Sequence, residues 1–139
     1  HKGRLRGRPT LLPALGADLA TGLAAAGEHL HARGISHGDF YAHNVLYRPE
    51  GGCYLADFGA ASFYSPRASG GTDPFEALEV RAFGCLLGEL LERCEPESEP
   101  EPDVRLPSLK ALQLRCVAPL AASRPRFAEL VASLESLRQ

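Results

Sequence analysis

The sequence contains no methionine, and none of its apolar runs is long enough to span a bilayer. It also lacks the opening pattern of a signal peptide. Because no initiator residue is present, we expect the 139 residues to be an excerpt from a longer chain. With no membrane segment and no signal pattern, the default expectation is a cytoplasmic location.

Strong charge of either sign is missing as well. The formal net charge is −2, so the chain has no global basic field that would attract nucleic acid or anionic lipid. The basic run at residues 1–8 is interpreted as a solvated terminus rather than a phosphate-binding patch. The four cysteines form no CxxC pair and do not cluster with histidine, which argues against a zinc site. We expect them to be reduced and partly buried.

Hydrophobic residues make up 45% of the chain and charged residues 23%, which is typical of one folded globular domain. Apolar residues at three- and four-residue steps from Leu12 to Leu30 predict a helix of about five turns, ended by Gly34. The same periodicity predicts helices from Glu79 to Leu91, through Leu109 to Cys116, and from Phe127 to Leu137. These segments make the fold mainly α.

Short apolar segments at 45–46 and 53–56 flank the turn sequence RPEGG and predict a β-hairpin after the first helix. Residues 60–74 are rich in Ser, Gly and Pro and are expected to form a loop. For the last helix, Ser123 is the expected N-cap and Pro125 is expected in the first turn. The layout is four helices and one hairpin.

The sequence HGDFYAHN at 37–44, followed by DFG at 57–59, carries the chemistry. Asn44 stands where the first hairpin strand begins and Asp57 follows the second, so antiparallel pairing would bring both to the open end of the hairpin. Asp39 lies in the loop that leads to the same end. An amide oxygen and a carboxylate suit Mg²⁺, and phosphoryl transfer needs a metal together with a carboxylate that orients the attacking hydroxyl.

These residues resemble the catalytic loop and DFG motif of the protein-kinase superfamily. The resemblance implies that Asp39 is the catalytic base, that Asn44 and Asp57 bind Mg²⁺ and ATP, and that His37 supports the loop together with Phe58 and Gly59.

The resemblance extends from about Leu12 to the end of the chain and includes two later segments. EVRAFG at 79–84 is similar to the start of the family's central buried helix, with Glu79 in place of the usual aspartate, and SRPRF at 123–127 is similar to the segment that carries a structural arginine, here Arg124. It implies that residues 1–139 form a kinase-like C-terminal lobe, with helices packed around a catalytic loop and a small hairpin.

Several positions depart from the protein-kinase pattern. Gly38 replaces the arginine that pairs with a phosphorylated activation loop, and Tyr41 replaces a lysine that neutralises the transferred phosphate; His43 would compensate only partly. The segment from Asp57 to Glu79 is short and contains no APE sequence, and Glu76 is the nearest candidate partner for Arg124. No glycine-rich loop or strand lysine precedes residue 12, so activity would require an N-terminal lobe.

The first hypothesis for function is a protein kinase that transfers the ATP γ-phosphate to a Ser, Thr or Tyr hydroxyl of a protein with Mg²⁺. Two alternatives stay open. HGD in place of HRD is also typical of aminoglycoside-type and other small-molecule phosphotransferases. The missing lysine and the short loop favour a pseudokinase-type interaction module that transfers nothing.

Overall fold

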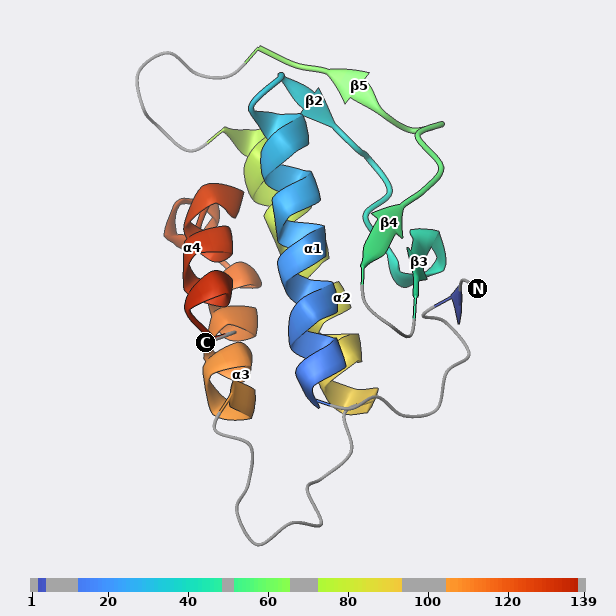
Figure 1. The fold of residues 1–139 in the computed structure, drawn as a ribbon. Helices are drawn as coiled ribbons and strands as arrows, with labels where there is room; N and C mark the ends of the chain where they lie inside the picture. The colour runs from blue at the N-terminus through green and yellow to red at the C-terminus, as the bar shows by residue number, and fades with distance from the viewer. Residues whose placement is uncertain (1–2, 5–12, 49–51, 66–72, 94–104, 138–139) are drawn as a thin grey trace, which may run out of the picture.

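The computed structural model describes residues 3–4, 13–48, 52–65, 73–93 and 105–137. Four α-helices occur in these residues: α1 (Pro13–His31), α2 (Pro74–Arg93), α3 (Arg105–Cys116) and α4 (Phe127–Leu137). The strands are β1 (Gly3–Arg4), β2 (Ile35–Ser36), β3 (Val45–Tyr47), β4 (Cys53–Leu55) and β5 (Ser62–Phe63). Figure 1 shows α1 at the centre, α4 and α3 on one side of it and the β3–β4 hairpin on the other. The mainly helical fold with a small hairpin is confirmed.

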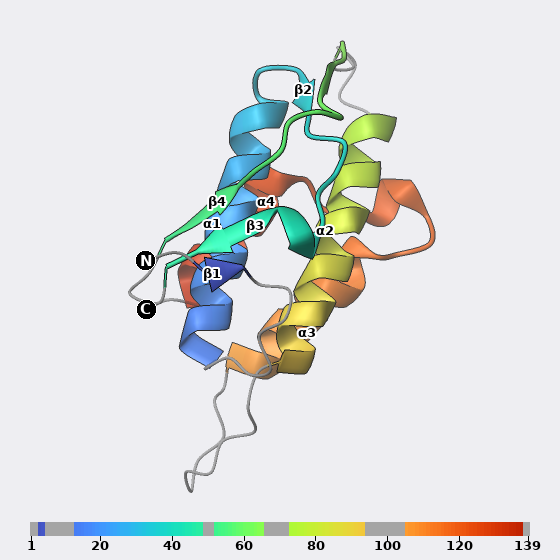
Figure 2. The same ribbon diagram turned by 90° about the vertical axis from the view of Figure 1, so that its right-hand side faces the viewer.

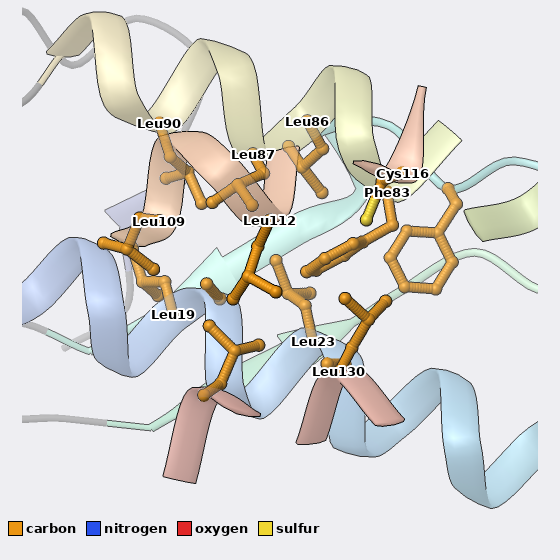
Figure 3. Close-up of a cluster of buried hydrophobic side chains, with 14 of the residues drawn as sticks. Leu19, Leu23, Phe83, Leu86, Leu87, Leu90, Leu109, Leu112, Cys116 and Leu130 are labelled. Atoms are coloured by element: carbon orange, nitrogen blue, oxygen red, sulfur yellow. The ribbon is translucent and has the colours of Figure 1, made fainter. Parts of the chain in front are cut away.

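The helices pack around one apolar core. Leucines from all four helices and three phenylalanines are almost fully buried, among them Leu19, Leu23, Phe83, Leu87, Leu112 and Leu130 (Figure 3). Burial of this apolar surface is the main favourable term in folding. The predicted helical stripes of the sequence are therefore the faces that meet in the core.

The hairpin forms where the sequence predicts it. β3 pairs antiparallel with β4, with Val45 opposite Leu55, and β1 adds to the other edge of β3, with Gly3 opposite Tyr47. Gly34 ends the turn after α1 at a φ of 69°, a left-handed conformation that glycine adopts without strain.

Two expected boundaries are wrong. α2 begins at Pro74, five residues before Glu79, because the Asp73 carboxylate accepts hydrogen bonds from the Phe75 and Glu76 amides and Pro74 suits the first helical position. The expected loop at 60–74 also contains β5, which pairs with β2.

The start of the last helix differs too. Ser123 lies in a 3₁₀ turn, Ala121–Ser123, and α4 begins at Phe127, beyond Pro125. The Arg126 amide donates instead to the Glu129 carboxylate, 3.3 Å away, and thereby caps the first turn. Leu12 lies outside the described residues. Within the part of the chain that the structure describes, no helix has the length and apolar character needed to cross a membrane.

Candidate active site

Asp39 and Asn44 are in direct contact within the loop segment (residues 37–44) that joins β2 to β3. The Asn44 side-chain amide donates to the Asp39 carboxylate (Nδ2 to Oδ2, 2.8 Å) and to the Asp39 backbone carbonyl (2.9 Å). His43 Nε2 lies 3.2 Å from the same Oδ2. Two side chains thus hold one oxygen of the carboxylate, and the other oxygen can face a substrate.

The surroundings of Asp39 keep it ionised. The hydrogen bond from Asn44 lowers the pKa of the Asp39 carboxyl most; slight burial opposes it, and His43 and His37 lower it further. The net pKa lies below the usual range for aspartate. Asp39 is therefore a carboxylate at neutral pH, the form that accepts a hydrogen bond from a hydroxyl.

Asp57 lies at the same end of the hairpin as Asn44. The Ala56 amide donates to the Asn44 carbonyl at 2.8 Å, which extends the β3–β4 pairing up to the residue before Asp57. The Asp57 side chain is exposed, its φ is 57°, and its Oδ1 accepts the Gly59 amide at 3.1 Å. Aspartate tolerates this left-handed conformation when its side chain bonds the backbone locally. The turn presents the Asp57 carboxylate to solvent beside the hairpin end.

His37 is fully buried between the loop segment and the end of β4. Its Nδ1 accepts the Asp39 amide at 3.1 Å, so its Nε2 carries the proton and donates to the Ala56 carbonyl at 2.9 Å. The Phe58 ring packs edge-on against the His37 ring, with centroids 4.7 Å apart. These contacts join the two halves of the site.

Glu79 anchors the loop segment to α2. Its buried carboxylate accepts the backbone amides of His37 (2.9 Å) and Gly38 (2.8 Å), and also bonds Ser36 Oγ (3.3 Å) and His31 Nε2 (2.9 Å). Burial alone would raise the pKa of the Glu79 carboxyl, but the hydrogen bonds outweigh burial and the net pKa is lowered. A charged Glu79 thus fixes the loop.

Arg124 does not pair with Glu76, so that expectation is wrong. Its guanidinium donates to the carbonyls of Ala118 (2.9 Å) and Ala77 (3.0 Å). Glu76 pairs with Arg126 at 3.1 Å and accepts the Tyr64 hydroxyl at 2.8 Å. The later start of α4 explains the exchange, since Arg126 rather than Arg124 directly precedes the helix and reaches the first turn of α2.

Sequence reasoning missed the role of His31. His31 is buried and bonds Glu79, far away in the chain, so no local spacing signalled the pair. His43 had a usable signal, because it stands four residues after Asp39. Tyr41 is half exposed and stacks on His43 with ring centroids 6.0 Å apart.

The donor set at the hairpin end suits a hard cation. The Asn44 amide nitrogen is occupied by Asp39, so the amide oxygen is the atom left for a metal, and the Asp57 carboxylate is exposed nearby. Magnesium often takes one or two protein oxygens and completes its shell with phosphate and water. Among the described residues, no group of three His, Cys, Asp or Glu side chains is placed to hold a metal ion.

The arrangement of helices, loop segment and hairpin defines a protein-kinase-like C-terminal lobe. Residues 15–80, just under half of the chain, match the lipopolysaccharide kinase (Kdo/WaaP) family. The matched stretch contains the loop segment, the hairpin and the start of α2. No curated protein matches the chain. The match fits the protein-kinase-like superfamily.

Proposed function

We propose that this chain is the C-terminal lobe of a kinase-like phosphotransferase that moves the ATP γ-phosphate to a sugar hydroxyl of a lipopolysaccharide-type acceptor. The observation that carries the proposal is the ionised Asp39, held by Asn44 and His43 beside the hairpin end that bears Asp57. The likeness of residues 15–80 to lipopolysaccharide kinases supports the choice of acceptor. An N-terminal lobe upstream would complete the nucleotide site.

In the proposed reaction, Asp39 accepts a hydrogen bond from the acceptor hydroxyl and orients its oxygen toward the γ-phosphorus. Asn44 and Asp57 would hold Mg²⁺, which would neutralise charge on the phosphates. A new bond forms between the acceptor oxygen and phosphorus, the bond from the γ-phosphorus to ADP breaks, and the hydroxyl proton leaves by way of Asp39. His37 and Glu79 keep the loop segment in place during the transfer.

The experiment measures ATP-dependent phosphorylation of purified lipopolysaccharide core oligosaccharide by the natural protein that contains this sequence. Replacing Asp39→Asn keeps the size of the side chain but removes the carboxylate, so we expect a loss of about 10²- to 10⁴-fold in transfer rate. Asp18→Asn, an exposed change on α1, is the matched control and should leave the rate unchanged.

Three outcomes would contradict the proposal in different ways. Equal rates for the wild-type protein and the Asp39→Asn variant would remove the role of Asp39. Phosphorylation of a mixed peptide library with none of the oligosaccharide would support a protein kinase instead. Absence of transfer to either acceptor would support the interaction module.

A further inference from the structure

Two cavities flank Tyr41 beside the loop segment. One, of about 520 Å³, is lined by Asp39, Tyr41, Ala42, His43, Glu89 and Arg93, and we call it the polar cavity. The other, of about 170 Å³, is lined mostly by apolar and aromatic side chains and Cys85, and we call it the apolar cavity. Its lining residues are Phe40, Tyr41, Phe75, Leu78, Ala82 and Cys85, together with Ser36, Gly38, Glu79 and Arg81. Tyr41 lines both, so the two cavities adjoin at its half-exposed ring.

The wall opposite the loop segment is a single face of α2. Leu78, Ala82, Cys85, Glu89 and Arg93 follow one another at three- and four-residue steps, which places them in one row along the helix. Figure 2 shows the chain between β2 and β3 running beside α2. The two cavities are therefore sections of one groove between α2 and the loop segment, which we call the α2 groove.

The chemistry of the groove changes along its length. At the Asp39 end it carries charged and hydrogen-bonding groups, whereas at the other end Phe75 and Leu78 expose 52% and 63% of their surface. Apolar side chains this exposed beside a candidate site favour binding, because a ligand that removes them from water lowers the free energy of the complex. A ligand that matches the whole groove has a polar, hydroxyl-bearing part joined to a hydrocarbon part.

The backbone around the groove disfavours a peptide ligand. The amides of His37 and Gly38 are taken by Glu79, and the backbone of α2 is used within the helix. Recognition of an extended peptide relies on free backbone groups that add it as a strand. Apart from Gly38, side chains form these two walls, which suits a hydrocarbon chain and a sugar.

We infer that the α2 groove binds an amphipathic acceptor, with its hydroxyl-bearing head against Asp39 and its hydrocarbon part along Leu78 and Cys85. Tyr41, between the two cavities, contacts the junction of head and hydrocarbon. This inference rests on the proposed function for the position of the head. Leu78 and Cys85 contact the hydrocarbon part and thereby determine which acceptor binds, at a distance from the transferred phosphate.

Cys85 allows a binding test that needs no phosphoryl transfer. It is exposed, whereas burial raises the pKa of Cys53 to about 11 and that of Cys116 to about 12, so both stay unreactive thiols at pH 7.5. Cys94 lies outside the described residues and is removed as Cys94→Ser. The rate at which iodoacetamide modifies Cys85 is then followed by mass spectrometry, with octyl glucoside below its micellar concentration as the amphipathic probe.

We expect octyl glucoside to slow modification of Cys85 at least about threefold and glucose alone to leave the rate unchanged. Leu78→Asp should abolish the protection, because a carboxylate in the apolar cavity opposes burial of hydrocarbon. Leu114→Asp, at a similarly exposed leucine on α3, is the matched control and should keep it. The measurement reports binding without transfer, so a failure of the proposed reaction can be told from a failure of this inference.

Three results would overturn the inference. One is an unchanged rate at every concentration of octyl glucoside below micelle formation. Another is equal protection by glucose, which would place binding at the polar cavity alone. The third is protection by a leucine-rich peptide but not by the glycoside, which would make the groove a site for a protein acceptor.

Discussion

Gly38 has a backbone conformation that other residues adopt only with strain. Its φ is 83°, and a Cβ atom at this position would lie 2.3 Å from the Ala60 carbonyl oxygen. Its amide also donates to Glu79, so the loop cannot shift without losing that bond. The arginine that protein kinases commonly carry before the catalytic aspartate therefore does not fit here, which gives the HGD sequence a steric cause.

We predict that Gly38→Ala lowers the free energy of unfolding by more than the strain of a left-handed alanine, which is about 1–3 kcal/mol. Gly52→Ala is the matched control, because Gly52 has a similar φ of 89° but nothing within 4 Å of the added Cβ. Urea unfolding of both variants isolates the contact with Ala60. Equal losses for the two would show that the close approach has no cost.

The residues of the site differ in how visible they are in the sequence. The contact between Asp39 and Asn44 was predictable, because both lie in one short loop and the hairpin after it fixes the direction of the chain. The partners of Arg124 and His31 were not, because each bond joins segments that only the packing of helices brings together. A single sequence holds no spacing signal for such pairs.

At the scale of elements, a small residue sets the distance between α1 and α4. An added Cβ at Gly27 would lie 2.5 Å from the Phe127 ring, which is buried at the first residue of α4. The Phe127 ring also stacks on Phe40, with centroids 5.6 Å apart, so it has little freedom to move. Phe40 belongs to the loop segment, and the approach of α4 to α1 therefore affects the position of the loop.

We predict that Gly27→Ala destabilises the protein by about 1–3 kcal/mol, the usual cost of overpacking a core. Alanine is the better helix former by about 1 kcal/mol, so this propensity reduces the loss and does not reverse it. Gly88→Ala in α2 is the control, since its Cβ would meet the flexible end of Gln113 at 3.2 Å. We expect that variant to be neutral or more stable in thermal unfolding, and a more stable Gly27→Ala protein would contradict the packing argument.

Element boundaries were predictable where the buried face extends to the end of a helix. α1 ends near Gly34 as expected, because Leu30 keeps the apolar period to its last turn. The first turn of α2 was missed because Phe75 and Leu78 point into solvent and break the period that starts at Val80. The capping aspartate and the proline at 73–74 were the available signal, and they lay in a stretch whose composition indicated a loop.

At the scale of the whole molecule, Glu79 joins three parts of the lobe. Its carboxylate bonds His31 at the end of α1, Ser36 in β2, and the His37 and Gly38 amides of the loop segment. In Figure 1, α1 lies in front of α2, and β2 begins just beyond the end of α1. A single buried charge thus couples the core helices to the candidate site.

Because of these bonds to Glu79, the free energy of unfolding should decrease at acid pH. The folded-state pKa of Glu79 is lowered, so the folded protein holds the ionised form better than the unfolded chain does. Its contribution to stability is fully present above the unfolded pKa of about 4.3 and is lost as the pH falls through the folded-state pKa. We predict that Glu79→Gln lowers the free energy of unfolding at pH 7 by about 1–3 kcal/mol. The neutral Gln side chain accepts hydrogen bonds from the backbone amides of His37 and Gly38 more weakly than a carboxylate does, and it leaves His31 without a carboxylate partner.

The free energy of unfolding of this variant should approach that of the wild-type protein as the pH falls below about 4.3. Protonation of Glu79 then removes from the wild type the negative charge that the substitution removes at every pH. Urea unfolding between pH 7 and pH 3 measures the gap directly. Glu92→Gln, an exposed change near the end of α2, controls for the loss of one negative charge and should show a small gap throughout. A gap for Glu79→Gln that stays constant over this range would mean that shape rather than charge holds the loop segment against α2.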